Sequence, residues 1–304
     1  MIKPISSIPV FFRPEMAADA GSYSPSAGKP PLVVADWQAH GMPVTVRSFE
    51  AVNEATLTLA HDANYVRDIL AGRIANGFGN RSRAVAATLT YTSGAMLAAA
   101  QAAIASGRVA CAPVSGFHHA GYAGGGGFCT FNGLMITALA LKREGRVSRI
   151  GILDLDQHWG DGTHDIIRHL GLDWVSHHSP GPEVPSASDA TRYLRRLPGI
   201  MGSFHDCDLL LYQAGADAHV DDPLGGWMTS EQLAERDRIV FDIAATVGVP
   251  VAWNLAGGYQ RSADGGIEPV LAIHRRTMEA CARVFVAGSE VSRWRDRPSV
   301  WLTL

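Results

Sequence analysis

Three apolar, strand-like runs of this chain each end in polar side chains, and this pattern limits the folds open to it. In chain order, the polar residues that follow the runs are Asp154, Asp156 and His158, then Asp217, then Tyr259. Side chains of a strand alternate between its two faces, so Asp154, Asp156 and His158 are expected to project from the same face. Polar side chains in a row at the end of a buried strand are costly unless they bind a ligand. The runs therefore predict buried strands whose ends form a binding site.

The rest of the chain alternates between strand-like runs and helical segments. Three segments have the residues expected at helix ends: one from Thr92 or Ser93 to Gly107, one from residue 132 to Gly145, and one from the capping box of Thr229 and Gln232 to Gly248. This alternation is typical of a parallel sheet with helices on both faces. We therefore expect a three-layer α/β/α fold with a central, mainly parallel sheet, built as a single domain over residues 1–304. Ligands of such sheets bind at the carboxyl ends of the strands, where the polar residues lie.

Charge and hydropathy exclude some classes of partner. The formal net charge is −3 and Lys and Arg form no run, so the sequence lacks the basic patch of a nucleic-acid-binding protein. It has no run of about 18 apolar residues, and prolines interrupt the N-terminal segment before any signal-length apolar core. The four cysteines show no C-x-x-C spacing and are predicted to be buried free thiols. We expect a cytoplasmic protein that binds neither nucleic acid nor membranes.

Several of the polar residues have an ordinary structural explanation when taken singly. His118 and His119 end another apolar run, but an adjacent histidine pair is usually a surface or hydrogen-bonded feature. Tyr259 alone would be a buried tyrosine with a satisfied hydroxyl. Asp221 and Asp222 are expected to form a solvent-exposed turn rather than to be further metal ligands. The joint occurrence of such residues at strand ends is what favours a shared site.

Four motifs in this order, GFHHAGYAGGGGFCTFN, DLDQHWGDGT, GADAHVDDPLG and LAGGY, resemble the zinc-dependent histone deacetylase superfamily. This superfamily includes the bacterial acetylpolyamine amidohydrolases, and the similarity runs from about Pro9 to Tyr259. The resemblance implies an arginase/deacetylase-like fold. It also implies a Zn²⁺-dependent amidohydrolase, with Fe²⁺ as an alternative metal. The substrate would be an acylated amine such as acetyl-lysine or acetylpolyamine.

The resemblance implies a role for each matching residue. Zinc would be bound by Asp156, His158 and Asp217. The catalytic set would be the dyad His118 and His119, the carboxylates Asp154 and Asp161 that orient them, and Tyr259, which binds the substrate carbonyl. The acyl-lysine tunnel would include Gly127 and Phe128. A structural K⁺ would be bound around Asp154, Asp156, His158, Ser176 and His177.

These roles fit the chemistry of amide hydrolysis. Three protein ligands leave a fourth zinc position for water. Two carboxylates and a neutral imidazole give the metal site a net charge near zero, so the metal acidifies its water less than an all-histidine site would. A separate base is then needed. We assign base and then acid to His119 and an electrostatic role to His118, while Tyr259 donates its O–H to the developing oxyanion.

The sequence also departs from the family pattern, and two other functions stay open. Phe117 stands where many members have glycine, as in the smaller class IV deacetylases, and Trp159 stands where a second histidine is common. The segment after Ser176 is short and offers no obvious second aromatic to face Phe128. One alternative is an arginase-like binuclear manganese ureohydrolase, although no D-x-H-x-D cluster is found. The other is a catalytically silent module that binds acyl-lysine or a partner.

Overall fold

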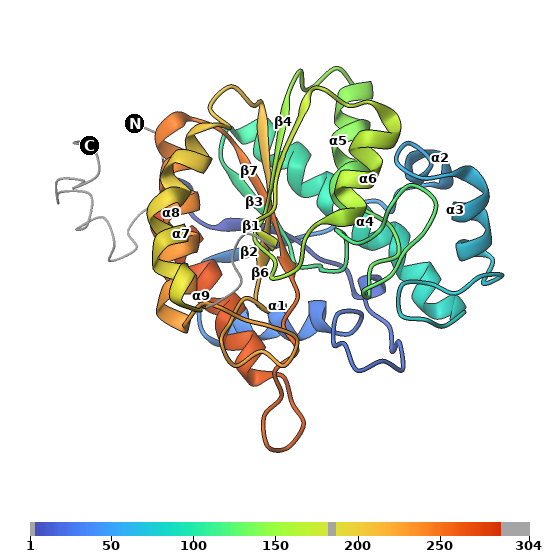
Figure 1. The fold of residues 1–304 in the computed structure, drawn as a ribbon, viewed down its shortest axis with the longest axis horizontal. Coiled ribbons are helices and arrows are strands. Elements are labelled where there is room, and N and C mark those ends of the chain that lie inside the picture. Colours follow the sequence, from blue (N-terminus) through green and yellow to red (C-terminus); the bar gives the residue numbers. More distant parts are fainter. Residues whose placement is uncertain (1–3, 182–186, 287–304) are drawn as a thin grey trace.

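A central sheet of seven strands, all parallel, organises the residues that the computed structural model describes, 4–181 and 187–286 (Figure 1). The strand order is β2-β1-β3-β7-β6-β4-β5. The strands are β1 (Ile8–Phe11), β2 (Val44–Arg47), β3 (Val109–Ala112), β4 (Ile150–Asp154), β5 (Val175–His178), β6 (Leu209–Gly215) and β7 (Val251–Ala256). The neighbours β3, β7, β6 and β4 lie at the centre of the sheet, so their carboxyl ends meet in one region.

Helices cover both faces of this sheet, which confirms the predicted three-layer fold. On one face lie α1 (Lys29–Ala39), α7 (Ala187–Gly202), α8 (Ser230–Val247) and α9 (Glu268–Phe285). On the other lie α4 (Arg83–Ser106), α5 (Gly133–Arg143) and α6 (Asp161–Leu170), with the short α2 (Glu54–Leu57) and α3 (Ala63–Leu70) beyond them. A short 3-10 helix, η1, spans Pro14–Met16. None of the helices described is long and apolar enough to cross a membrane.

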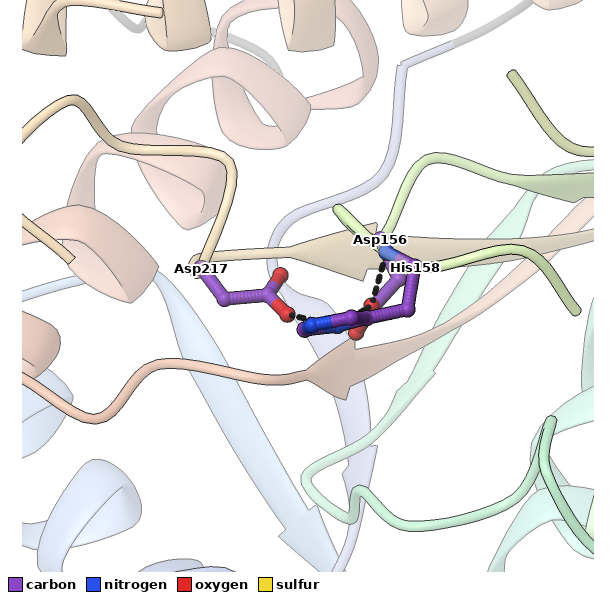
Figure 2. Close-up of side chains that lie close together, drawn as sticks. All are labelled: Asp156, His158 and Asp217. Atoms are coloured by element: carbon purple, nitrogen blue, oxygen red, sulfur yellow. Dashed lines mark hydrogen bonds and ion pairs between the residues drawn. The ribbon is translucent and has the colours of Figure 1, made fainter. Parts of the chain in front are cut away.

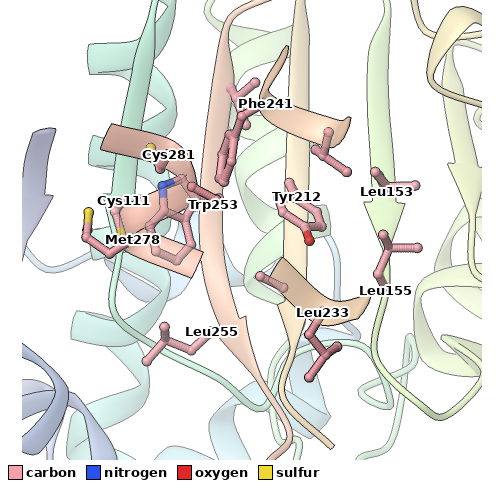
Figure 3. Packing of buried hydrophobic residues seen from close by; sticks show 14 of the residues in the cluster. Cys111, Leu153, Leu155, Tyr212, Leu233, Phe241, Trp253, Leu255, Met278 and Cys281 are labelled. Carbon is pink, nitrogen blue, oxygen red and sulfur yellow. The ribbon is translucent and has the colours of Figure 1, made fainter. Parts of the chain in front are cut away.

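The two cores follow from the alternation of side chains along the strands. Figure 3 shows the core between the sheet and α8 and α9, where Tyr212 and Trp253 point from the sheet toward Phe241. Ile150, Ile152, Leu209 and Leu211 belong to the opposite core, against α4 and α5. Strands with both faces covered are predominantly apolar, which is typical of parallel sheets. The four cysteines are buried and free, as expected.

Helix ends show where local sequence signals are sufficient and where they mislead. The capping box of Thr229 and Gln232 begins α8, and Gly248 ends it with a φ of 80°. The predicted start of the Ala-rich helix at Thr92 or Ser93 is wrong, because α4 begins at Arg83, capped by Ser82. Within α4 the Thr92 hydroxyl donates to the carbonyl of Leu89, 3.2 Å away. A hydroxyl that bonds back to the preceding turn is compatible with a helix interior, so a capping residue type does not by itself mark a start.

Candidate metal centre and active site

The side chains of Asp156, His158 and Asp217 converge at the carboxyl ends of β4 and β6 (Figure 2). The β4 strand ends at Asp154, so Asp156 and His158 lie on the following loop rather than on the strand as the alternation suggested. His158 Nδ1 lies 3.2 Å from Asp156 Oδ1 and 3.2 Å from Asp217 Oδ2. One potential ligand atom from each residue lies within 4.8 Å of the others. The pairing of β4 with β6 is what brings these distant segments together.

The donor set fits a divalent cation. Both carboxylates are buried, and buried negative charges require a positive partner. Without a metal that partner is His158, since its hydrogen bonds to Asp156 and Asp217 raise its pKa to about 10. Burial and the neighbouring Asp156 carboxylate raise the pKa of Asp217 to about 7. A nitrogen and two carboxylate oxygens without thiolate suit Zn²⁺ or Fe²⁺ better than a soft metal.

His118 is paired with a buried carboxylate beside the three metal-ligand candidates. Its Nδ1 lies 2.8 Å from Asp154 Oδ2, and its Nε2 lies 3.6 Å from Asp156 Oδ1. Asp154 is fixed in turn, because its Oδ1 accepts a hydrogen bond of 2.9 Å from the side-chain amide of Gln213 on β6. Burial alone would lower the pKa of His118. The surrounding carboxylates, Asp154 first, outweigh that effect and raise it to about 9.

His119 is the more exposed member of the pair. Its Nδ1 lies 2.6 Å from Asp161 Oδ1, and its ring centre lies 4.0 Å from that of His118. Burial, reinforced by the charge of His118, lowers the pKa of His119. The Asp161 carboxylate accepts a hydrogen bond from Nδ1–H, which leaves Nε2 of a neutral His119 free to accept a proton. The two histidines therefore differ in protonation, and that difference suits them for separate tasks.

Tyr259 lies near the start of the loop after β7, directly after Gly257 and Gly258, whose φ angles are 47° and 90°. A Cβ on Gly257 would lie 2.2 to 2.4 Å from the Asp217 carboxylate, so only glycine permits this approach. Burial raises the pKa of Tyr259, which keeps its hydroxyl protonated and able to donate. Its ring packs against Phe128, with centres 5.6 Å apart.

The tunnel candidates Gly127 and Phe128 lie beside these residues. A Cβ on Gly127 would lie 2.5 Å from Cδ2 of His119, which accounts for a glycine at this position. The segment after Ser176 offers no obvious second aromatic in the sequence, and part of it, residues 182–186, lies outside the described residues. Two aromatic rings that sequence reasoning missed lie here instead. Phe78 packs against Phe128 at 6.0 Å, and Tyr23 stacks on Tyr259 at 6.3 Å.

The residues of the predicted potassium site are brought together only in part. Asp154, Asp156 and His158 are neighbours, and His177 pairs with Ile152 across the adjacent strands. Ser176 pairs with Gly151, further from the strand ends, and its hydroxyl lies 3.4 Å from the guanidinium of Arg149. The potassium site therefore stays a prediction, with Ser176 its most distant member.

Asp221 and Asp222 have opposite environments, so the expectation of a common solvent-exposed turn is wrong for one of them. The side chain of Asp221 is 79% exposed. Asp222 is 6% exposed, and its Oδ2 accepts a hydrogen bond of 2.8 Å from the backbone N–H of Tyr259. Sequence reasoning missed this contact, because nothing in an Asp-Asp-Pro turn tells which carboxylate faces inward.

Lys29, at the start of α1, is a second residue that the sequence did not reveal. Its side chain is 0% exposed, and its ammonium donates to the carbonyl of Gly257, two residues before Tyr259. Burial lowers its pKa from 10.5 to about 8, against the opposing effect of Asp217, Asp156 and Asp222. Few lysines are fully buried without an ion-pair partner, and a cation here offsets the negative charge of the carboxylates.

This depressed pKa predicts a stability that rises with pH. Between about pH 8 and 10.5 the folded chain has lost the Lys29 proton while the unfolded chain keeps it, so unfolding becomes less favourable across that window. The free energy of unfolding should gain about 3 kcal/mol relative to Lys29→Met over this range. Urea unfolding of both chelator-treated proteins at several pH values measures the difference. A difference that does not change with pH would show that Lys29 titrates normally.

The fold and the site together define an arginase/deacetylase-like α/β protein with three metal-ligand candidates and two carboxylate-paired histidines at its strand ends. The family model of the histone deacetylase domain matches residues 32–181 and 183–268. The chain belongs to the histone deacetylase family.

Comparison with individual proteins agrees with this assignment. The chain is 32% identical to an uncharacterized protein of Picosynechococcus over 234 residues, which are 69% of this chain and 77% of that one. It is 30% identical to histone deacetylase 2 of Arabidopsis thaliana over 48% of this chain and 43% of that protein. A probable deacetylase of Methanothermobacter thermautotrophicus is 32% identical over 49% of this chain and 52% of its own length. The alignments with these two named deacetylases thus span about half of each relative.

Solved structures share the fold. The HD domain of HDA15 matches with a TM-score of 0.72 at 19% identity, over 97% of this chain and 90% of that domain. Acetylpolyamine aminohydrolase from Burkholderia pseudomallei matches with a TM-score of 0.65 at 19% identity, over 91% of this chain and 99% of that protein.

Proposed function

We propose that this protein is a zinc-dependent deacylase that removes an acetyl or other acyl group from an acylated amine. The observation that carries the proposal is the metal-ligand triad directly beside two histidines, each paired with a carboxylate. A binding module needs no such pairs, because orienting and charging an imidazole matters for proton transfer rather than for recognition. Membership of the histone deacetylase family supports the same activity.

Each residue of the site has a distinct task in this reaction. A divalent ion held by Asp156, His158 and Asp217 would supply Lewis acidity toward the acyl carbonyl and lower the pKa of water. Neutral His119 takes the proton of the attacking water through Nε2 as the new carbon–oxygen bond forms. The same imidazole then gives that proton to the amine as the carbon–nitrogen bond breaks, leaving a carboxylic acid and a free amine.

His118 and Tyr259 stabilise the charge that develops between these steps. The carboxylate of Asp154, hydrogen-bonded to Nδ1 of His118, favours the positively charged form of this imidazole beside the reacting centre. Tyr259 donates its O–H to the oxyanion of the tetrahedral intermediate. Asp154 and Asp161 hold the two imidazoles in position through Nδ1. Phe128 and Gly127 border the approach of the substrate.

Metal analysis together with turnover of a fluorogenic acetyl-lysine amide tests the proposed function. We expect about one zinc or ferrous ion in the triad of each active chain. Turnover should be lost on treatment with a chelator and recovered when Zn²⁺ is added back. A chain that binds the metal but does not turn over any acylated amine would instead be a silent binding module. Two manganese ions with guanidine hydrolysis would indicate the arginase-like alternative.

We further predict that the preferred substrate is an acylated small amine that carries positive charge. The chain is net acidic, the exposed ring of Tyr23 can receive a cation, and the Asp161 side chain is 65% exposed near His119. Acetylated polyamines should therefore be hydrolysed with higher kcat/KM than acetyl-lysine peptides or longer acyl-lysines. This advantage should shrink as salt is raised from 10 to 500 mM, because salt screens the electrostatic attraction between exposed charges that lie more than roughly 10 Å apart.

A panel of acetylated polyamines, acetyl-lysine peptides and longer acyl-lysines, assayed at both salt concentrations, makes the comparison. Uncharged acetylated amines of similar length serve as the matched control. If acetyl-lysine peptides are the better substrates at both salt concentrations, the preference for small cations is wrong while the deacylase activity stands.

A further inference from the structure

The loop after β6 is tied to the loop of Tyr259 by a single buried carboxylate. Asp222 follows Asp217 on the β6 loop and is 6% exposed. Its Oδ2 accepts a hydrogen bond of 2.8 Å from the backbone N–H of Tyr259. Its Oδ1 accepts one of 3.0 Å from the backbone N–H of Leu224, within the β6 loop itself. Both oxygens are thus occupied, and one of them connects two loops of the site.

The Tyr259 loop needs such an anchor because of its two glycines. Gly257 and Gly258 have positive φ angles and no side chains that restrict their rotation. Both are pressed against neighbours, since an added Cβ would lie within 2.4 Å of the Asp217 carboxylate at Gly257 and 2.7 Å from Val270 at Gly258. A buried N–H requires an acceptor, and a carboxylate makes a stronger hydrogen bond than a neutral oxygen. Lys29 holds the carbonyl of Gly257, and Asp222 therefore fixes the backbone two residues further on, at Tyr259 itself.

The ring of Tyr259 depends on this backbone anchor for its position. Its contacts with Phe128 and Tyr23 are ring against ring, with centres 5.6 and 6.3 Å apart. Aromatic contacts of this kind tolerate sliding of one ring over the other. A hydroxyl that donates to an oxyanion tolerates much less, because a shift of about 1 Å can cost 10²-fold in rate.

We propose that Asp222 is a positioning residue, which places the Tyr259 hydroxyl over the substrate carbonyl by holding the Tyr259 backbone N–H. This inference rests on the proposed function and names a further residue of the same site. It also links the two loops mechanically, since Asp222 and the metal-ligand candidate Asp217 belong to one loop. The adjacent Asp221, with a side chain 79% exposed, has no such contact with Tyr259 and is the natural control.

The test compares five variants of the zinc-loaded full chain, with a fluorogenic acetyl-lysine amide as substrate. Asp222→Ala should lower kcat about 10- to 10²-fold with KM within about threefold, because misplacing the hydroxyl affects the transition state more than binding. Asp222→Asn keeps one oxygen as an acceptor but replaces the other with an NH2 donor that faces an N–H. Its kcat should therefore fall less than that of Asp222→Ala. Asp221→Ala should behave as the wild type. Zinc content should stay at that of the wild type in all three.

The double variant Tyr259→Phe/Asp222→Ala decides whether Asp222 acts through Tyr259. If it does, adding Asp222→Ala to Tyr259→Phe lowers kcat by less than about threefold further, because the hydroxyl that Asp222 positions is already gone. The proposal would be overturned if kcat of the double variant fell by the product of the two single-variant factors. Wild-type kcat in both Asp222 variants, or loss of zinc from Asp222→Asn, would also overturn it. Should Asp222→Ala not fold, the same comparison is made with Asp222→Asn. A Tyr259→Phe variant with wild-type kcat would refute the role of Tyr259 itself, which is a failure of the proposed function.

Discussion

Asp217→Ala should lose most of the bound metal and, with it, nearly all turnover. Asp217 is fully buried and is one of the three metal-ligand candidates that the described residues bring together, so its removal leaves Asp156 and the partly exposed His158. Two protein ligands hold Zn²⁺ far more weakly than three, and metal content should fall from about one ion per chain to a small fraction of that. Turnover should fall by at least about 10³-fold, because water then lacks its activating ion.

Metal analysis after gel filtration, with a thermal unfolding curve, measures this outcome. Asp221→Ala is the matched control, an aspartate on the same loop whose side chain is exposed. The pKa of Asp217, raised to about 7, adds a pH dependence, since the ion must displace a proton from this buried pair. Because the ion must also displace the proton of His158, whose pKa is raised to about 10, metal affinity of the wild type should weaken as pH falls below about 10 and more steeply below about 7. Unchanged metal content in a folded Asp217→Ala variant would remove Asp217 from the ligand set.

Tyr259→Phe should separate catalysis from metal binding. The substitution removes one oxygen and preserves the ring, so its packing against Phe128 and Tyr23 is expected to survive. Loss of one oxyanion donor costs about 2.7 to 4 kcal/mol, which corresponds to a kcat lower by about 10²- to 10³-fold. KM should change little, since the hydroxyl interacts most strongly with the charge of the transition state.

Steady-state kinetics at saturating substrate, together with metal content, tests this variant. Tyr23→Phe is a suitable control, because it removes a tyrosine hydroxyl from the ring stacked on Tyr259. It should retain kcat within about threefold of the wild type. A near wild-type kcat for Tyr259→Phe, with metal retained, would mean that Tyr259 packs against the site without taking part in the reaction.

The sequence was sufficient for the parts of the site that local periodicity and strand order determine. Apolar runs that end in polar residues predicted parallel strands, and parallel strands place their carboxyl ends together. That rule places Asp156, His158 and Asp217 at one edge of the sheet. Their grouping as metal ligands came from the motif resemblance, and the pairing of β4 with β6 brings them together. The pairs of His118 with Asp154 and of His119 with Asp161 came from the motif resemblance, and the structure places each pair within hydrogen-bond distance.

The remainder depended on contacts between residues far apart in the chain. Lys29 reaches Gly257 and Tyr23 reaches Tyr259 because the segments before and within α1 pack beside the β7 loop, a placement that no local pattern encodes. Asp221 and Asp222 have the same chemistry and adjacent positions, so only the tertiary structure distinguishes the buried one. The start of α4 was predicted wrongly because Thr92 is a residue type common at helix starts. In the structure Thr92 lies inside a longer helix that begins at Arg83.

The dependence of the metal site on the pairing of β4 with β6 has a thermodynamic consequence. Until these strands are in register, Asp217 is far from Asp156 and His158, and an unfolded chain offers an ion at most the local pair of Asp156 and His158. An ion that binds the native chain alone adds its binding free energy to the folding free energy, about 2.7 kcal/mol when its free concentration is 100 times its dissociation constant. A bound ion would thus also act as a cross-link between the ends of the two central strands, and starvation for metal would lower the free energy of unfolding as well as the activity.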